Sequence, residues 1–264
     1  MKLFKGKAIY QPDGRAAEYA RWACNFYTGC SNGCTYCYNK RWGWGNTPKL
    51  KAYFKSERHA LEIFEKELAA NLPELQKYGL FFSFSTDPCL KETLTLTAKA
   101  MVLCVHNNIS IKLLTKKVNF LGNHFIVNEQ YRKMMSVGFT LTGHDELEPG
   151  ASPNSERIAA MEKLHDAGFK TWASIEPIID FESSVDMIGQ TRNFCDLYKI
   201  GLQSHKVYDR ATTERFVRFV CSTKSKSGKS SALYFKDSLL QQADINREDL
   251  PENCVSRDYN MFSR

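Results

Sequence analysis

Short β-rich segments alternate with helical segments along most of this chain, and this alternation limits the folds open to it. The β-rich segments are ACNFYTG (23–29), LFFSFS (80–85), ISIKLLT (109–115), FTLT (139–142), KTWASIE (170–176), LYKIGL (197–202) and ALYFKD (232–237). Helical patterns cover 56–72, 92–108, 123–136, 155–168, 183–194 and 213–221. Right-handed crossovers place each helix on a face of a parallel sheet. We therefore predict an α/β fold, a partial (β/α)6 or near-complete βα barrel of parallel strands.

The chain of 264 residues is long enough for one domain of barrel size. We divide it into an N-terminal extension (1–22), a βα barrel core (23–205) and a C-terminal βα extension (206–264) that completes or flanks the barrel. No apolar run approaches the roughly 20 residues of a membrane span, and the first residues lack the apolar core of a secretion signal. We expect a cytoplasmic protein without membrane contact. The sequence does not indicate its oligomeric state.

Polar residues follow the predicted strands at the point where each strand ends. They are Thr28 and Cys30, Ser85 to Asp87, Thr115 and Lys116, Thr142, Ser174 and Glu176, and Gln203 and Ser204. In a βα barrel the carboxyl ends of all strands lie on one rim, and such folds place their chemistry there. We therefore expect these side chains to line one active site.

Three of the nine cysteines, Cys30, Cys34 and Cys37, lie within eight positions after the first predicted strand. With Cys24 they would offer four thiolates to zinc, but structural zinc sites usually consist of two knuckles separated by a longer loop. A ferredoxin cluster needs a fourth thiolate and a C-x2-C-x2-C spacing. Three thiolates on a 4Fe–4S cluster leave one iron without a protein ligand, and an open coordination position is typical of a reactive metal site.

The spacing C-x3-C-x-Φ-C, with Tyr36 before the third cysteine, is similar to the signature of the radical S-adenosylmethionine (SAM) superfamily. The segments GCSNGCTYCY, FSFSTDP, LLTKK, FTLTGHDELEPGASPNSERIAAMEKLHDAGF and ASIEPII resemble the spore photoproduct lyase-like branch, over roughly residues 25 to 200. SIEPII and YKIGLQ also resemble phage-associated radical SAM proteins without assigned chemistry. The resemblance implies an enzyme whose 4Fe–4S cluster, reduced by an external donor such as flavodoxin or ferredoxin, cleaves SAM to a 5′-deoxyadenosyl radical.

The resemblance also implies roles for residues near the cluster. Cys30, Cys34 and Cys37 would be its ligands. Tyr36 would pack beside the cluster and reach adenine with its backbone, and Tyr38 would line the same pocket.

Further contacts to SAM are implied at the ends of three predicted strands. Thr86 and Asp87 would meet the SAM amino group, Lys116 its carboxylate, and Thr140 or Thr142 its ribose. We expect only one of these two threonines to face the barrel interior, because side chains alternate along a strand. Asp87 could instead cap a turn before the proline that follows it, and Lys116 could simply be exposed.

Two positions depart from the lyase pattern. Glu176 ends the fifth predicted strand, where the resemblance implies an apolar residue. We predict that Glu176 is a catalytic residue, and its charge argues for a substrate different from that of the lyases. The lyases return a hydrogen atom from a cysteine in the second-strand segment, and Phe84 occupies the matching place here. Phenylalanine cannot serve as this donor, and Cys89, five residues later, is the candidate that could replace it. Reversal of a thymine dimer is therefore not expected, and another radical reaction is favoured.

Two basic segments free of acidic residues point to a nucleic acid base or nucleotide as substrate. Residues 38–56 contain Lys40, Arg41, Lys49, Lys51 and Lys55, and residues 215–236 contain Arg215, Arg218, Lys224, Lys226, Lys229 and Lys236. Neutralising Lys224, Lys226 and Lys229 should then weaken DNA or RNA binding; the alternative is that both segments are solvated loops. For the whole chain, the alternative to an enzyme is a nucleic-acid-binding protein with a structural or redox-sensing cluster.

Overall fold

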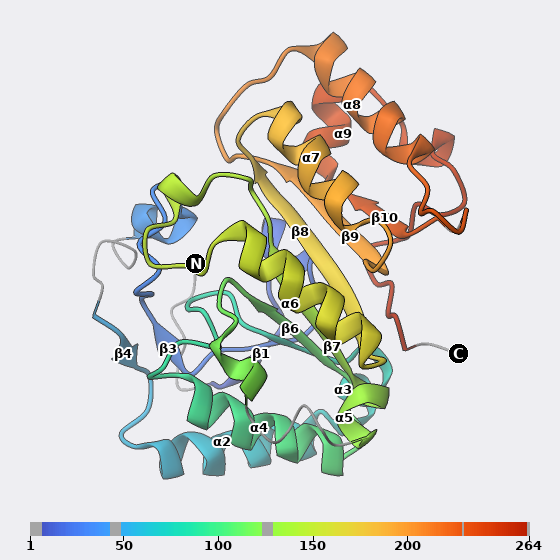
Figure 1. Cartoon of the computed structure of the whole chain (residues 1–264). Coiled ribbons are helices and arrows are strands. Elements are labelled where there is room, and N and C mark those ends of the chain that lie inside the picture. The colour runs from blue at the N-terminus through green and yellow to red at the C-terminus, as the bar shows by residue number, and fades with distance from the viewer. Residues whose placement is uncertain (1–6, 43–48, 123–128, 229, 263–264) are drawn as a thin grey trace.

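The computed structural model describes residues 7–42, 49–122, 129–228 and 230–262, and its centre is one eight-stranded sheet (Figure 1). The parallel strands are β2 (Ala23–Cys24), β5 (Leu80–Phe82), β6 (Ile111–Thr115), β7 (Met135–Thr140), β8 (Lys170–Ile178), β9 (Leu197–Leu202) and β10 (Ala232–Phe235). β1 (Ile9–Tyr10) runs antiparallel to β2. In the strand order β1-β2-β5-β6-β7-β8-β9-β10, β1 and β10 are the two edges. The sheet is thus a partial barrel, and the predicted fold class is confirmed.

Helices connect the parallel strands, and Figure 1 shows α2, α4 and α6 packed along the outside of the sheet. Their bounds are α1 (Gly14–Ala17), α2 (Glu57–Ala70), α3 (Leu72–Tyr78), α4 (Leu94–His106), α5 (Glu129–Met134), α6 (Asn154–Asp166), α7 (Phe181–Thr191), α8 (Arg210–Ser222) and α9 (Asp237–Ala243). Side chains cap three of the longer helices, because Ser56, Asp180 and Asp209 accept a hydrogen bond from an amide three residues ahead. None of the helices in the described residues is both long and apolar enough to cross a membrane.

Most predicted elements are present, but the prediction of one continuous strand over 23–29 is wrong, because this segment forms two short strands. The chain leaves the sheet after β2 because Asn25 turns its side-chain Oδ1 to the amides of Phe84 and Ser85. It then forms β3 (Tyr27–Thr28), which pairs with β4 (Lys51–Ala52) in a separate two-stranded sheet. The start of the predicted helix 123–136 lies outside the described residues, and its last two residues belong to β7 instead.

The sheet has a hydrophobic core on each face. The outer core, between sheet and helices, includes Phe64 of α2, Met101 of α4 and Met161 of α6. The barrel interior is filled by a second set, the interior cluster: Tyr19, Ala20, Ala23, Phe81, Trp172 and Leu197. Gly138 of β7 makes room for this cluster, since a Cβ atom there would lie 2.1 Å from Cε2 of Trp172.

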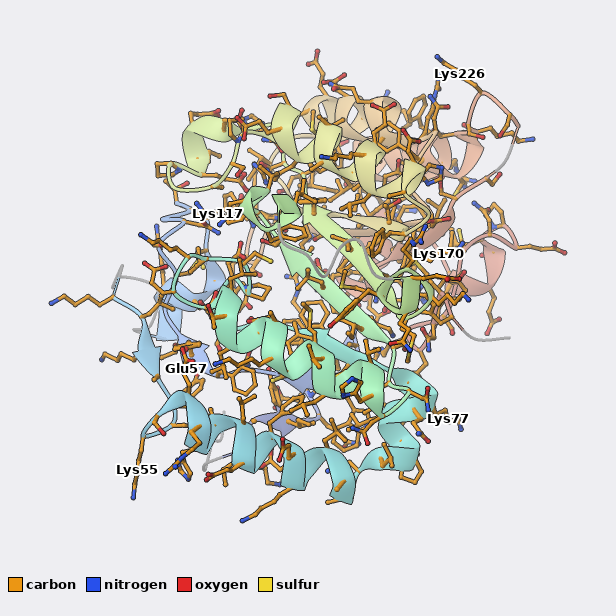
Figure 2. The ribbon with its side chains drawn as sticks, turned by 60° about the horizontal axis from the view of Figure 1, so that its bottom comes forward. Lys55, Glu57, Lys77, Lys117, Lys170 and Lys226 are labelled. Carbon is orange, nitrogen blue, oxygen red and sulfur yellow. The ribbon has the colours of Figure 1, made fainter. Side chains whose placement is uncertain are left out.

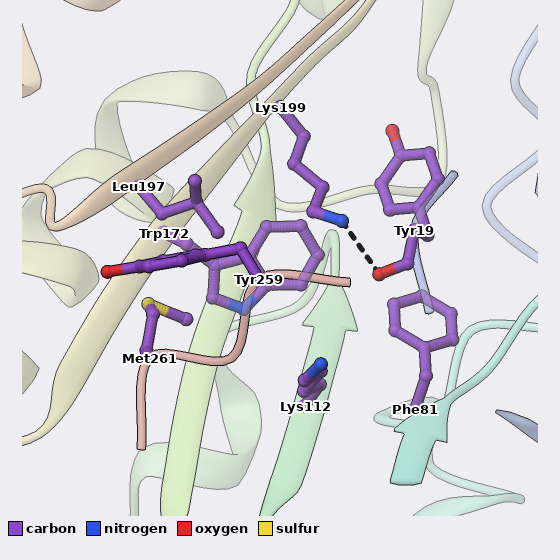
Figure 3. A pocket seen from close by; sticks show the side chains of 8 residues that line it. All are labelled: Tyr19, Phe81, Lys112, Trp172, Leu197, Lys199, Tyr259 and Met261. Atoms are coloured by element: carbon purple, nitrogen blue, oxygen red, sulfur yellow. Dashed lines mark hydrogen bonds between the residues drawn. The ribbon is translucent and has the colours of Figure 1, made fainter. Parts of the chain in front are cut away.

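The segment before β2 lies inside the barrel and is hydrogen-bonded to residues of β9 and of the loop after β10. The Nζ atom of Lys199, on β9, donates a hydrogen bond of 2.8 Å to the carbonyl oxygen of Glu18. It donates another of 2.7 Å to the carbonyl oxygen of Tyr19 (Figure 3). Lys236, directly after β10, donates to the carbonyl oxygen of Arg15 at 2.9 Å. The described part of the predicted extension 1–22 is therefore integral to the barrel. At the other end of the chain, β10 continues the sheet in parallel with β9.

Candidate active site at the cysteine loop

The cysteine loop, residues 29–37, follows β3 and contains Cys30, Cys34 and Cys37. All three are free thiols; Cys34 is buried, and Cys30 and Cys37 are half-buried. Gly33, with φ of +65°, supplies the left-handed residue that lets the loop turn between the first two cysteines. A turn hydrogen bond of 3.3 Å from the amide of Cys37 to the carbonyl of Cys34 closes its end.

A second loop, between β7 and α6, supports the cysteine loop from beneath. The amide of Thr35 donates to the carbonyl of Leu147 at 2.9 Å, and the amide of Gly150 donates to the carbonyl of Asn32 at 2.9 Å. The two backbones touch at Gly150, where a Cβ atom would lie 2.3 Å from the carbonyl oxygen of Ser31. Only glycine fits this approach, so the position of the cysteine loop depends on a loop more than 100 residues away in sequence.

Asp87 connects the cysteine loop to the ends of two strands. Its carboxylate accepts hydrogen bonds from the side chain of Asn32 (2.8 Å), the side chain of Thr115 (2.6 Å) and the amides of Cys89 (2.9 Å) and Lys116 (2.8 Å). The side chain is buried. Four donors leave this carboxylate well satisfied, which fits both the turn cap and a role in positioning its neighbours.

Glu148 and Arg157 form a buried ion pair below the cysteine loop. Both side chains are 0% exposed. Glu148 also accepts a hydrogen bond from the hydroxyl of Tyr36, and Arg157 donates to the carbonyl of Thr140. Lys116 brings its Nζ to 3.8 Å from Oε1 of Glu148. One carboxylate thus joins the aromatic residue of the cysteine motif, the end of β6 and the helix α6.

The positive charge of Lys116 acts on the thiol of Cys34. Its Nζ lies 5.6 Å from the centre of the Tyr36 ring, and its side chain is 17% exposed. Burial raises the pKa of the Cys34 thiol, and the charge of Lys116 opposes that rise. Burial, with a contribution from Asp87, raises the pKa of Cys30 to about 12. Because a metal takes the thiolate, binding at these cysteines must release protons and weaken as pH falls.

The donor atoms that this loop offers are three thiols, the ligand type that iron–sulfur clusters take. Within the described residues, no three His, Cys, Asp or Glu side chains surround one point as ligands of one metal ion would. A cluster does not need this, because each thiolate binds a different iron. Two buried polar atoms beside the thiols, Oδ1 of Asn32 and Oγ1 of Thr86, have no hydrogen-bond partner in the described chain. Buried polar atoms without a partner are costly, which suits a polar ligand at this position.

The other predicted SAM contacts lie on the same rim. Tyr38 is 49% exposed and its hydroxyl donates to the carbonyl of Phe84. Thr140 and Thr142 are both buried. The expectation that only one of them faces inward is wrong: Phe139 and Leu141 pack in the outer core, so the two threonines, two residues apart, share the other side.

Glu176 lies at the end of β8 within a dense polar network. Its carboxylate accepts from the hydroxyl of Tyr19 (2.7 Å) and from Arg15 (3.1 Å), and it pairs with Lys236 at 2.9 Å. The Tyr19 hydroxyl also lies 2.5 Å from Oγ of Ser174. Glu176 therefore anchors the N-terminal segment inside the barrel. Lys236, a member of the second basic segment, is buried here and is not available to a phosphate.

Cys89 and Phe84 lie on different sides of the sheet. Cys89 is 1% exposed and packs in the outer core, where burial raises the pKa of its thiol. Phe84 packs against the interior cluster, with its ring stacked 4.4 Å from that of Phe81. The structure therefore does not bring Cys89 to the barrel interior. Cys24, the possible fourth zinc ligand, is also buried in the outer core and does not join the other three thiols.

Comparisons with known proteins decide the family. The family model described as spore photoproduct lyase matches residues 10–201. The chain belongs to the spore photoproduct lyase family. This confirms the radical SAM resemblance that the cysteine spacing indicated, and with it an enzyme of radical SAM type.

Relatives of this family member are distant. An uncharacterized protein of Methanocaldococcus jannaschii is 27% identical over 195 residues, which cover 68% of this chain and 69% of that protein. Two crystal structures of Streptococcus suis SuiB share the fold. SuiB alone has a TM-score of 0.58 and 13% identity, and SuiB bound to S-adenosylmethionine has a TM-score of 0.55 and 11% identity. They align with 87% and 83% of this chain, which spans only about half of the SuiB chain (52% and 51%).

Sequence reasoning missed Glu148, Arg157 and Asn32, which hold the site of this family member together. A signal for Arg157 exists, because it shares the buried face of α6 with Ala160, Met161 and Leu164 at helical spacing. A charge on such a face needs a buried partner. For Glu148 and Asn32, which lie in loops, the sequence contains no comparable pattern.

His144 also escaped notice as a connector of two loops on this rim. Its ring nitrogens lie 2.7 Å from Glu146 and 2.6 Å from Asp180, the residue that caps α7. Partial burial lowers the pKa of His144, but the hydrogen bonds to both carboxylates outweigh it and raise the pKa above its ordinary value.

We predict that Glu148→Gln destabilises the fold, because the neutral amide leaves the buried charge of Arg157 with only the more distant carboxylate of Asp145, whose Oδ1 lies 3.6 Å away. The loss in free energy of unfolding should be about 3–5 kcal/mol, measured by urea denaturation. Glu156→Gln, an exposed acid one residue from Arg157, is the matched control and should change it by under about 0.5 kcal/mol. Equal stability of the two variants would contradict a role for the ion pair.

We predict that the contribution of His144 to stability depends on pH. Since its pKa is raised in the folded state, the stabilisation is complete below the unfolded pKa of about 6.5 and disappears as pH rises through the folded value. His144→Asn should therefore lower the free energy of unfolding by up to about 1 kcal/mol at pH 6 and by much less at pH 9. A cost that is the same at both pH values would show that the pair is not charged.

Proposed function

We propose that this chain holds a 4Fe–4S cluster on Cys30, Cys34 and Cys37 and cleaves SAM in a radical reaction. The observation that supports this most is the set of three free thiols on one loop at the carboxyl ends of the strands, with Cys24 and Cys89 turned into the outer core. When bound, the cluster would supply the electron that cleaves SAM to methionine and a 5′-deoxyadenosyl radical. SuiB, which shares the fold, has been crystallised with SAM bound.

In this proposal the chain positions SAM with residues that already meet at the cysteine loop. Lys116 pairs with the SAM carboxylate, and Thr86 offers its unpaired Oγ1 to the amino group. Asp87, bonded to four donors, acts by fixing Asn32 and the end of β6 rather than by a free lone pair. Thr140 lies on the face of β7 that would meet the ribose.

The buried walls of the site would exclude water and hold charges in place. Tyr36 would pack beside the cluster, fixed by its hydrogen bond to Glu148, and Tyr38 would line the mouth. Glu176 would hold Tyr19 and Arg15 in place inside the barrel, so that substrate meets an ordered wall. A reductant such as flavodoxin or ferredoxin would deliver electrons from outside.

We infer that the substrate is a nucleic acid base or nucleotide, bound through the first basic segment. Lys51, on β4, and Lys55, before α2, are exposed and lie on the strand-to-helix side of the barrel, as the cysteine loop does. The loop with Lys224 and Lys226 joins α8 to β10, so it lies at the amino ends of the strands. Figure 2 shows Lys226 and Lys55 at opposite extremes of the molecule. This placement argues against a role for Lys224 and Lys226 beside the site.

We predict SAM cleavage by the anaerobically reconstituted protein with reductant, measured as 5′-deoxyadenosine by chromatography. Cys34→Ala should lose both the cluster absorbance and the product. Lys116→Met should keep the cluster but weaken SAM binding by about tenfold or more, because a hydrogen bond to a charged group is worth roughly 1.5–3 kcal/mol. Cys221→Ser, distant from the loop, is the control. A fully loaded protein that binds nucleic acid but releases no 5′-deoxyadenosine would instead favour a structural or redox-sensing cluster.

We predict that the Lys51→Gln/Lys55→Gln variant binds single-stranded oligonucleotides more weakly than the unchanged protein. The slope of log Kd against log salt should fall by about one for each phosphate that no longer pairs with a lysine. The Lys224→Gln/Lys226→Gln variant removes the same charge from the opposite end and should bind normally in the same fluorescence anisotropy titration. If both variants lose equal affinity, binding follows net charge rather than a defined surface.

A further inference from the structure

Two cysteines outside the candidate active site lie side by side. The Sγ atoms of Cys221 and Cys254 are 3.9 Å apart, although 33 residues separate them in sequence. Cys221 belongs to the last turn of α8, and Cys254 belongs to the C-terminal tail, residues 251–262. Both are half-buried free thiols, so a small molecule in solution can reach them.

The backbone holds both cysteines in place. The tail runs beside β10 at this point: Leu233 donates to the carbonyl of Asn253 and accepts from the amide of Val255, both at 2.8 Å. Cys254 itself donates to the carbonyl of Pro251 at 2.8 Å. A disulfide needs the sulfur atoms about 2.05 Å apart. Starting from 3.9 Å, the two sulfur atoms must therefore approach by about 1.9 Å.

The two thiols differ in acidity. A hydrogen bond from Cys254, and to a lesser degree the charge of Arg218, lowers the pKa of Cys221, although burial opposes this. The same pairing and burial raise the pKa of Cys254. A thiol of lowered pKa attacks a disulfide, and its neighbour then resolves the product. The charge of Arg218 favours the thiolate of Cys221, so Cys221 takes the first step and Cys254 the second.

We propose that Cys221 and Cys254 form a reversible disulfide by exchange with a small-molecule disulfide. The Cys221 thiolate attacks one sulfur of that disulfide, forms a mixed disulfide and releases the first small thiolate. Cys254 then loses its proton and attacks Cys221 Sγ, which forms the internal disulfide and releases the second small thiolate. The protein gives up two electrons and two protons, and the small disulfide is reduced to two thiols.

The disulfide would secure the tail against the amino end of the barrel. Beyond Cys254 the tail is held by the backbone bond of Val255, by Arg257 to Asp237 at 3.0 Å and by two longer contacts. These are Asp258 to Arg21 at 4.0 Å and Asn260 to the carbonyl of Lys77 at 3.4 Å. Here Tyr259 and Met261 cover a pocket that Lys112 and Lys199 also line (Figure 3). A covalent bond at Cys254 shortens the free part of the tail and so favours this cover.

The test equilibrates the anaerobically purified protein with mixtures of glutathione and glutathione disulfide, blocks free thiols with N-ethylmaleimide and maps peptides by mass spectrometry. We expect a peptide pair linked through Cys221 and Cys254, 2 mass units below the sum of its reduced forms, and reversal by dithiothreitol. Oxidation should also raise Tm by several degrees and slow amide hydrogen exchange in residues 255–262.

Matched variants separate this pair from the other cysteines. Cys221→Ser and Cys254→Ser should lose the linked peptide, the rise in Tm and the slowed exchange, whereas Ser222→Ala, an exposed neighbour, should keep all three. The proposal is overturned if both thiols remain fully blocked by N-ethylmaleimide in the most oxidising mixture, or if Cys254 links to a cysteine other than Cys221. Neither outcome depends on whether the protein cleaves SAM.

Discussion

The buried carboxylate of Glu148 is the group on which the arrangement of the site depends. A carboxylate with 0% exposure is stable only when its charge is paired and its oxygens accept hydrogen bonds. Arg157, Tyr36 and Lys116 provide these partners, and each comes from a different part of the chain. The contacts that pair the Glu148 carboxylate therefore fix α6, the cysteine loop and the end of β6 relative to one another.

A second constraint is the open barrel. A sheet with two edges and a wide interior must be filled, and the chain fills it with its own N-terminal segment. Tyr19 packs among Phe81 and Trp172, donates its hydroxyl to Glu176 and accepts from Lys199 at its carbonyl. Lys236 donates to the carbonyl of Arg15 in the same segment. Burial lowers the pKa of Lys199 well below its ordinary value, so this packing has an electrostatic cost. Carbonyl oxygens and carboxylates of the same network offset that cost.

Several features of the site could be predicted from the sequence because they are local. The spacing of Cys30, Cys34 and Cys37 indicated the family, and the polar residues after each strand indicated the rim. Lys116 was predicted there and lies next to Tyr36. The strand pattern was applied wrongly to Thr140 and Thr142, because side chains two residues apart lie on the same face of a strand. It was also misleading for residues 23–29, where a side-chain contact from Asn25 interrupts a run of good strand formers.

The sequence by itself determined the fold class and the family, because strand and helix periodicity and cysteine spacing are read from neighbouring residues. Only the tertiary structure decided which cysteines share a site, since Cys24 and Cys89 pack in the outer core while Cys34 lies on the cysteine loop. Only the structure placed Lys226 at the opposite extreme of the molecule from Lys55, and Cys221 beside Cys254. These facts depend on contacts between residues distant in the chain, and charge pairing and packing set such contacts after the elements have formed.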